Sequence, residues 1–214
     1  MGPGSITQVI GEQALIAVVE VDDAPSAAEL ARCLRDTGVS AVEITLRSPR
    51  ALAALEAAAA VDGIVVGAGT VLSTKDVRRC QEVGAEFLVS PVFEESVALL
   101  SRSLDMFFAP GAATPTEVHR ALEAGFSEVK VFPAEPLGGL ALVRSLAAVF
   151  PSARFMPTGG IDQQSAAEYL AHPSVIAVGG SWIAPPSLIR SADWSSIEQR
   201  AREATTALSQ GESR

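Results

Sequence analysis

Residues 128–158, EVKVFPAEPLGGLALVRSLAAVFPSARFMPT, carry the pattern that decides the fold. The segment opens with a short apolar run, Glu128–Pro133, and closes with a second, Arg154–Thr158. Between them, Leu140–Phe150 places apolar residues at the spacing of a helix. A strand, a helix and a strand in this order indicate parallel strands that are covered by helices.

The same unit recurs along the whole chain. Apolar runs of strand length occupy Leu15–Val21, Ala41–Arg47, Ile64–Val71, Phe87–Val92, Met106–Gly111, Glu128–Pro133, Arg154–Thr158 and Val175–Gly180. Helical spacing lies between them, and Gly38, Gly84 and Gly125 follow three of the helices as left-handed caps. Eight strand–helix units predict an α/β fold, a closed (β/α)8 TIM barrel. The alternative is a doubly wound sheet, but no G-x-G-x-x-G turn follows the first strand.

The two ends of the chain add elements to the barrel. Ser5–Ala14 is predicted to be a short extra helix that plugs the bottom of the barrel, and the residues from Trp194 onward form the eighth helix and a frayed tail. Residues 1–214 are expected to form a single domain, with Met1–Ser5 as a disordered linker or a cloning remnant.

Composition excludes several classes of function. The formal net charge of −9 disfavours nucleic acid and anionic membranes as partners. No apolar run reaches the roughly 18 residues of a membrane span. Cys33 and Cys80 lie in predicted helices without metal or redox spacing, which predicts reduced thiols in a cytoplasmic protein. His119 and His172 lie away from the strand ends, and no acidic triad accompanies them, so no metal site is expected.

Lys130 is the first candidate for chemistry. Strand alternation sends Val129 and Val131 to the outer face, under the helices, so that Lys130 points into the barrel near its carboxyl end. Burying an ammonium group is unfavourable, so this lysine must be paired with an acid or be neutral. A neutral amine is the nucleophile that imine formation requires. Three roles remain open from position alone: nucleophile, structural ion-pair partner, or ligand of a substrate phosphate.

The second strand offers partners for this lysine. Glu43, Thr45 and Arg47 share one face of the strand, opposite the apolar residues. Glu43 is predicted either to pair with Lys130 or to shuttle protons. Arg47, at the strand end, is predicted to grip a substrate carboxylate in bidentate fashion. A salt-bridge ladder that only fills the barrel is the alternative.

Three strands end in small residues: Gly67-Ala68-Gly69-Thr70, Thr158-Gly159-Gly160 and Gly179-Gly180-Ser181. Glycine allows a ligand to approach the backbone and its N–H groups. The last two sets close strands seven and eight, where barrels often bind phosphate. Oriented amides would supply positive potential in an acidic protein. Simple tight turns are the alternative.

These motifs resemble those of the 2-keto-3-deoxy-6-phosphogluconate/4-hydroxy-2-oxoglutarate (KDPG/KHG) aldolases. The similar segments, in order, are Gly38–Arg47 (GVSAVEITLR), Gly67–Val71 (GAGTV), Gly125–Ala134 (GFSEVKVFPA), Pro157–Ile161 (PTGGI) and Gly179–Trp182 (GGSW). The resemblance extends from about Leu15 to Ile183. The related phosphogalactonate aldolases differ at Thr45–Arg47 and Pro157–Gly160, so the chain is most similar to the KDPG enzymes.

The resemblance implies a class I aldolase that works without metal or cofactor, assembles as a homotrimer and takes a small keto-acid phosphate in the Entner–Doudoroff pathway. It implies that Lys130 forms the imine and that Glu43 acts as acid and base. By position, the remaining implied contacts are Arg47, Thr70 and Thr158 with the pyruvate portion, Pro91 and Phe132 lining it, and Gly159, Gly160, Gly180 and Ser181 with the phosphate.

Two residues depart from the family pattern. Val131 replaces Leu or Phe, which affects only packing, and Glu20 occupies a place where relatives carry a basic or apolar residue. An acid there weakens phosphate binding. The alternatives are therefore an unphosphorylated substrate such as 4-hydroxy-2-oxoglutarate, a phosphate-binding barrel isomerase that uses Glu43 and Lys130 without an imine, and a non-catalytic sugar-phosphate binder.

Overall fold

The computed structural model describes residues 5–11 and 14–211. Within these ranges, short strands alternate with helices. The strands are β1 Leu15–Val19, β2 Ala41–Thr45, β3 Val65–Gly69, β4 Phe87–Val89, β5 Phe107–Ala109, β6 Gly111–Ala112, β7 Glu128–Val131, β8 Arg154–Pro157 and β9 Val178–Gly180. The helices are α1 Ile6–Ile10, α2 Ala24–Asp36, α3 Ala51–Ala59, α4 Thr74–Glu82, α5 Glu95–Ser103, α6 Pro115–Glu123, the 3₁₀ turn η1 Glu135–Leu137, α7 Gly139–Val149, α8 Gln163–Leu170, α9 Pro186–Arg190 and α10 Trp194–Gly211.

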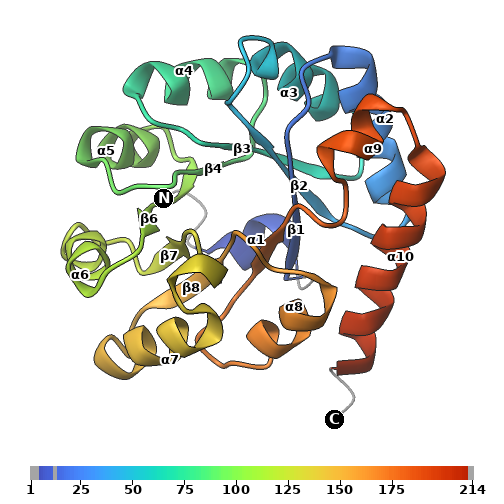
Figure 1. The fold of residues 1–214 in the computed structure, drawn as a ribbon. Coiled ribbons are helices and arrows are strands. Elements are labelled where there is room, and N and C mark those ends of the chain that lie inside the picture. The colour runs from blue at the N-terminus through green and yellow to red at the C-terminus, as the bar shows by residue number, and fades with distance from the viewer. Residues whose placement is uncertain (1–4, 12–13, 212–214) are drawn as a thin grey trace.

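The strands form a curled parallel sheet with the helices outside it (Figure 1). Six strands pair in the order β5-β4-β3-β2-β1-β9, and three pair in the order β6-β7-β8. An isolated parallel bridge, Thr158 to Gly179, joins the second set to β9. The α/β class and the parallel pairing predicted from the sequence are therefore confirmed.

The predicted strand Met106–Gly111 is divided into two. Pro110 separates β5 from β6, because proline has no N–H for the sheet. Its carbonyl still accepts a hydrogen bond from the Lys130 N–H at 2.8 Å. Several predicted strands also end earlier than expected; β2, for example, ends at Thr45, and Arg47 lies in the turn that follows. These shortened ends leave polar residues in loops at the carboxyl edge.

The outer face of the sheet packs against the helices as the alternation predicts. Val129 and Val131 of β7 are fully buried in one cluster with Val118 of α6 and Leu146 of α7. Because these valines point outward, the residue between them must point inward. The pattern thus fixes the direction of Lys130.

The amino end of the sheet is covered by α1, which lies behind the curled sheet in Figure 1. Ser5 caps this helix through its side chain, and Ile6 and Ile10 are buried. They pack in a cluster with interior strand residues that include Phe87 and Met156. The predicted plug is confirmed, although it ends at Ile10. Met1–Gly4 of the predicted linker, and Glu12 and Gln13 of the predicted helix, lie outside the described residues.

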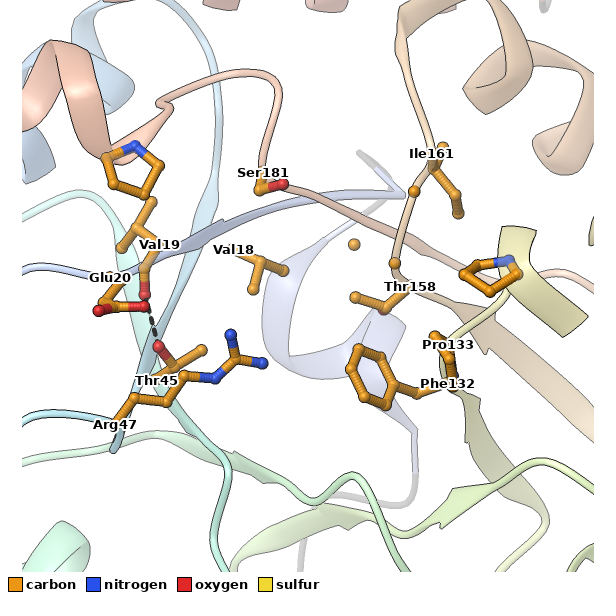
Figure 2. A pocket seen from close by; sticks show the side chains of 15 residues that line it. Val18, Val19, Glu20, Thr45, Arg47, Phe132, Pro133, Thr158, Ile161 and Ser181 are labelled. Carbon is orange, nitrogen blue, oxygen red and sulfur yellow. Dashed lines mark hydrogen bonds between the residues drawn. The ribbon is translucent and has the colours of Figure 1, made fainter.

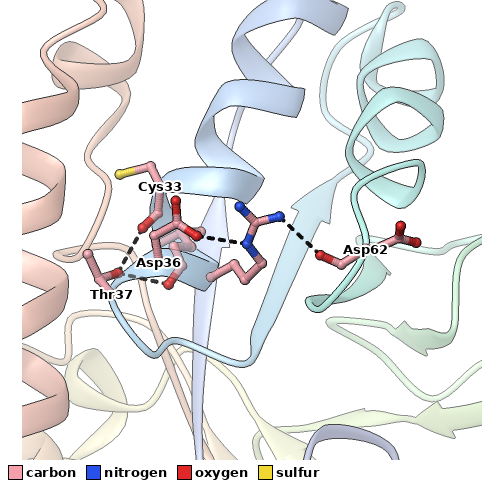
Figure 3. A network of polar contacts seen from close by, with 6 residues as sticks. Cys33, Asp36, Thr37 and Asp62 are labelled. Carbon is pink, nitrogen blue, oxygen red and sulfur yellow. Dashed lines mark hydrogen bonds and ion pairs between the residues drawn. The ribbon is translucent and has the colours of Figure 1, made fainter.

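A polar network also lies at the amino end, where α2 turns into β2 (Figure 3). Arg35 donates to Asp36 Oδ1 at 2.8 Å and to the Asp62 carbonyl at 3.2 Å. The Thr37 hydroxyl donates to the carbonyls of Cys33 and Leu34 at the end of α2. These bonds satisfy helix-terminal and loop carbonyls, so the network is structural.

The carboxyl-terminal part of the chain contains one helix that the sequence did not predict. The short α9 stands between β9 and α10 and begins with Pro186. The predicted last helix is confirmed as α10, which begins at Trp194. Among the described residues no helix is long and apolar enough to cross a membrane.

Candidate active site

The structure brings Lys130 and Glu43 together inside the curled sheet. Lys130 Nζ lies 3.0 Å from Glu43 Oε1 and 3.3 Å from Oε2. The two residues are only 4% and 2% exposed. They come from β7 and β2, which are not neighbours in the sheet, so the pair spans its interior. The predicted inward lysine and its predicted acidic partner are therefore confirmed as a buried pair.

Gly69 explains how the Glu43 carboxylate fits at this depth. Gly69 pairs with Thr45 across β3 and β2. A side chain at Gly69 would occupy the position of the Glu43 carboxyl group. This glycine of the Gly67–Thr70 motif therefore makes room for the buried acid.

A cavity of about 350 Å³ opens at the carboxyl end of the strands (Figure 2). Thr45 and Phe132 line it, and each stands two residues beyond Glu43 and Lys130 on the same strand face. The ion pair therefore lies one inward-facing residue deeper in the sheet than the residues that line the cavity. Lys130 Nζ lies 5.6 Å from the centre of the Phe132 ring. The full lining consists of Val18, Val19, Glu20, Thr45, Arg47, Phe132, Pro133, Pro136, Thr158, Gly159, Gly160, Ile161, Gly179, Ser181 and Pro186.

Two of the lining residues carry charges of opposite sign. Arg47 follows β2, and its guanidinium group points towards the middle of the cavity in Figure 2. Glu20 follows β1, at the exposed edge of the same cavity. A planar guanidinium with free donors is suited to a carboxylate. Together, Arg47 and Glu20 give the lining of the cavity a net side-chain charge of zero.

The glycine-rich wall lies across the cavity from Arg47. Gly159 and Gly160 have φ values of 101° and 81°, a conformation that favours glycine. Ser181 follows β9 and is exposed towards the cavity. Thr158, buried at the end of β8, completes this side. The wall therefore offers backbone and hydroxyl groups to a ligand without any basic side chain.

Three predicted contacts do not line the cavity: Gly180, Thr70 and Pro91. The ring of Trp182 packs where a side chain of Gly180 would begin, which gives that glycine a packing role. Thr70 has a positive φ of 61°, a strained conformation for threonine. Pro91 contacts Gly111, where a side chain would run into the Pro91 backbone.

Sequence reasoning did not assign a role to Thr45, although its position signalled one. Thr45 is 4% exposed, lines the cavity and donates its hydroxyl to the Val19 carbonyl at 3.1 Å. Alternation from Glu43 already placed it on the interior face. Its hydrogen bond fixes the junction of β1 and β2 directly below Arg47 and Glu20.

The remaining titratable candidates lie outside the site. No group of metal-ligating side chains occurs in the part of the chain that the structure describes. Cys33 and Cys80 are free and buried, and burial raises the pKa of each thiol to about 12. His119 is exposed, and His172 accepts a hydrogen bond from the Ser174 N–H.

The arrangement can carry out a defined sequence of chemical steps. A buried amine in contact with a carboxylate has a proton acceptor at hand, which is what an amine nucleophile needs. Arg47 can orient a carboxylate above that amine. The cavity is large enough for a small sugar acid, and the Phe132 ring at its base lies 5.6 Å from the amine.

Comparison with known proteins points to one family. The family model for KDPG and KHG aldolases matches residues 6–200. The 2-dehydro-3-deoxy-phosphogluconate aldolase of Treponema pallidum is 40% identical over 210 residues, which are 96% of this chain and 95% of that protein.

Two solved structures have the same fold. The 2-keto-3-deoxy-6-phosphogluconate aldolase of Zymomonas mobilis superposes with a TM-score of 0.87 at 39% identity, covering 93% of this chain and 95% of that one. The KDPG aldolase of Legionella pneumophila, crystallised with pyruvate captured at low pH as a covalent carbinolamine intermediate, has a TM-score of 0.87 at 32% identity, with 92% and 96% of the two chains covered.

Proposed function

This chain belongs to the family of KDPG and KHG aldolases, and from that membership we propose that it is a class I aldolase. The substrate is 2-keto-3-deoxy-6-phosphogluconate, and the products are pyruvate and glyceraldehyde 3-phosphate. The observation that carries the proposal is the buried contact of 3.0 Å between Lys130 Nζ and Glu43 Oε1 beneath an open cavity.

The first half of the reaction forms the imine. Proton transfer from the Lys130 ammonium to Glu43 turns a charged pair into a neutral one, which burial favours. The free amine then attacks C2 of the substrate ketone. Glu43 gives its proton to the C2 oxygen as the new bond forms, then takes the proton that the nitrogen loses and passes it to the C2 hydroxyl, which leaves as water. A protonated imine remains on Lys130.

The second half breaks the carbon–carbon bond. The C4 hydroxyl loses its proton to Glu43, the C3–C4 electron pair moves into the iminium group, and the aldehyde product leaves. The resulting enamine takes up a proton at C3. Water then adds to C2 and releases pyruvate, which returns the free amine. A single carboxylate 3.0 Å from the amine serves every proton transfer near C2.

The cavity supplies two binding regions for the two ends of the substrate. Arg47 holds the C1 carboxylate, with Thr158 and Phe132 beside the three-carbon portion. Gly159, Gly160 and Ser181 receive the phosphate. Thr70, Pro91 and Gly180 remain predicted contacts that a substrate-bound state would have to bring to the cavity.

The proposal includes a closed (β/α)8 barrel in a single domain. Two contacts support the closure: the bridge between Thr158 and Gly179, and the hydrogen bond from the Lys130 N–H to the Pro110 carbonyl. A homotrimer without cofactor, located in the cytoplasm, completes the proposal, and sedimentation analysis of the purified protein tests the assembly.

Borohydride trapping tests the proposed chemistry. Reduction in the presence of pyruvate should attach a three-carbon acid to Lys130, detected by peptide mass spectrometry. The control is Lys75→Met, which removes an exposed lysine at the start of α4 and should leave the adduct intact. An adduct on Lys75 alone, or unaltered turnover after trapping, would overturn the imine mechanism and favour an isomerase.

Glu20 favours a second candidate, the cleavage of 4-hydroxy-2-oxoglutarate. Its carboxylate lines the cavity and opposes the two charges of a phosphate more strongly than the single charge of the second carboxylate of 4-hydroxy-2-oxoglutarate. A comparison of kcat/KM for the two substrates separates the candidates. Equal values would remove the phosphate from the proposal while leaving the imine chemistry in place.

A further inference from the structure

The turn η1 runs beside the glycine-rich wall of the cavity and is hydrogen-bonded to it, and Pro136 of η1 also lines the cavity. The Ala134 N–H donates to the Thr158 carbonyl at 2.8 Å, and the Glu135 N–H donates to the Gly159 carbonyl at 3.0 Å. Residues 134–135 thus run beside residues 158–159. Because both carbonyls are engaged on this side, the wall presents its other groups to the cavity.

The Glu135 side chain is packed against the wall itself. Its Cβ lies 2.7 Å from the position where a side chain of Gly160 would begin. On the other side, a side chain at Gly139 would come within 3.2 Å of Glu135 Oε1 and 3.4 Å of the Tyr169 hydroxyl. Both neighbours are glycines with positive φ. The Glu135 side chain therefore fits between Gly160 and Gly139 because neither residue has a side chain.

Tyr169 holds the end of this side chain. Its hydroxyl donates to Glu135 Oε1 at 2.6 Å, and the residue is 1% exposed. Burial, together with the acceptor, raises the pKa of the tyrosine, so the hydroxyl stays protonated as the donor. Tyr169 belongs to α8, the helix that follows Gly160, whereas Glu135 precedes α7. The bond therefore ties together the two elements on either side of the wall.

We infer that Tyr169 and Glu135 are positioning residues that fix the Gly159–Gly160 wall for the phosphate end of the substrate. The inference rests on the proposed function and goes further, because it assigns a role to two residues that do not touch the reacting atoms. The bond also keeps the Glu135 carboxylate turned towards Tyr169 and away from the anion. Without it, the wall loosens and a negative charge is free beside the phosphate.

Tyr169→Phe tests this role, because it removes one hydroxyl and keeps the ring. The KM for 2-keto-3-deoxy-6-phosphogluconate should rise about threefold to tenfold, with kcat changed by less than about twofold. The KM for 4-hydroxy-2-oxoglutarate and the rate of pyruvate trapping should not change. Glu135→Ala should also raise this KM. Glu135→Gln, which keeps an acceptor for the hydroxyl, should keep the KM close to that of the wild type.

Ser101→Ala is the matched control, because the Ser101 hydroxyl is also fully buried and donates to a carbonyl, that of Val97 in α5. It should leave the ratio of the two KM values unchanged. Equal KM changes for both substrates in Tyr169→Phe, or none, would overturn the inference and leave Tyr169 a purely structural residue.

Glycerol 3-phosphate, which carries a phosphate but no ketone, separates this inference from the aldolase mechanism. Its Kd should rise in Tyr169→Phe by about the same factor as the KM. An unchanged Kd would overturn the positioning role even if pyruvate trapping succeeds. A failed trapping experiment would overturn the proposed function, while the Kd still decides the role of the wall.

Discussion

The interior of the curled sheet is mainly apolar at its amino end and contains a buried ion pair at its carboxyl end. At the amino end, Ile6 and Ile10 of α1 pack against strand residues such as Phe107, and the Glu128 carboxylate accepts a hydrogen bond from the Ile6 N–H at the start of α1. At the carboxyl end, Lys130 and Glu43 are buried together below an open cavity. Stability and chemistry are thus separated along the strand axis.

Two arginines illustrate the same difference. Arg35, at the amino end, donates to Asp36 and to the Asp62 carbonyl, and the nearby carboxyl of Asp36 has a lowered pKa because of this hydrogen bond (Figure 3). Arg47, at the carboxyl end, makes no ion pair within the described residues and points into the cavity (Figure 2). An arginine with its donors free at a cavity is available for a ligand.

The largest expected effect follows from Lys130→Met. Activity should fall at least about a thousandfold, because no amine remains to form the imine. The variant also leaves Glu43 buried without its partner, which should lower the free energy of unfolding by about 3–5 kcal/mol unless the carboxylate takes up a proton. Steady-state kinetics and urea denaturation measure the two effects.

The double variant Lys130→Met/Glu43→Leu separates stability from chemistry at this position. Replacing both charges with apolar groups should recover most of the lost stability and none of the activity. Activity in the double variant would contradict the assignment of the carboxyl-end pair to chemistry.

Glu43→Gln should have the next largest effect. Glutamine keeps the shape of the side chain and accepts a hydrogen bond from Lys130, but it cannot take up a proton. We expect kcat to fall about a hundredfold to ten-thousandfold. Borohydride should still trap pyruvate on Lys130, more slowly, as single-turnover mass spectrometry can follow. Turnover close to that of the wild type would show that Glu43 only fills the interior.

Ile10→Ala examines the amino end. Ile10 is 2% exposed in the cluster that closes the sheet, so its truncation should lower the free energy of unfolding by about 2–4 kcal/mol. At temperatures where the variant is folded, kcat and KM should remain within about twofold of the wild type. A matching loss of kcat in the folded variant would contradict the separation of the two ends.

Strand alternation was sufficient to predict the centre of the site. Val129 and Val131 determined the direction of Lys130. The same two-residue alternation in β2 placed Glu43 and Thr45 on one face, and Thr45 lines the cavity. Such predictions succeed because a one-residue shift would bury the charges under the helices. The order of the helices and strands followed from the alternation of short apolar runs with segments of helical spacing.

Other features depend on contacts between distant segments, which a local pattern does not contain. The break at Pro110 ends one run of pairing although the residues around it are apolar. Gly180 remains a predicted phosphate contact, but the sequence did not indicate that the ring of Trp182 packs where its side chain would begin. The bond between Glu135 and Tyr169 joins residues 34 apart in sequence, so neither residue signalled the other.

The smallest expected effect concerns Glu20. It tests whether this carboxylate at the carboxyl end repels the phosphate of the substrate. A carboxylate about 8 Å from a phosphate dianion in water opposes it by roughly 1 kcal/mol. Glu20→Gln should therefore raise kcat/KM for the phosphorylated substrate about threefold to fivefold. The value for 4-hydroxy-2-oxoglutarate, whose second anionic group is a carboxylate with a single charge, should rise less. In about 1 M salt the gain should vanish, because the screening length falls to about 3 Å.

Glu29→Gln is the matched control for this small effect. Glu29 is an exposed acid on α2 that pairs with Arg32, outside the cavity lining, and its removal changes the net charge by the same amount. If both variants increase kcat/KM equally, the effect comes from the overall charge of −9 and not from the cavity. If only Glu20→Gln increases kcat/KM, a single carboxylate at the edge of the cavity determines how strongly this site prefers a phosphorylated substrate. Lys130 and Glu43, which lie deeper, then act in the same way on both substrates.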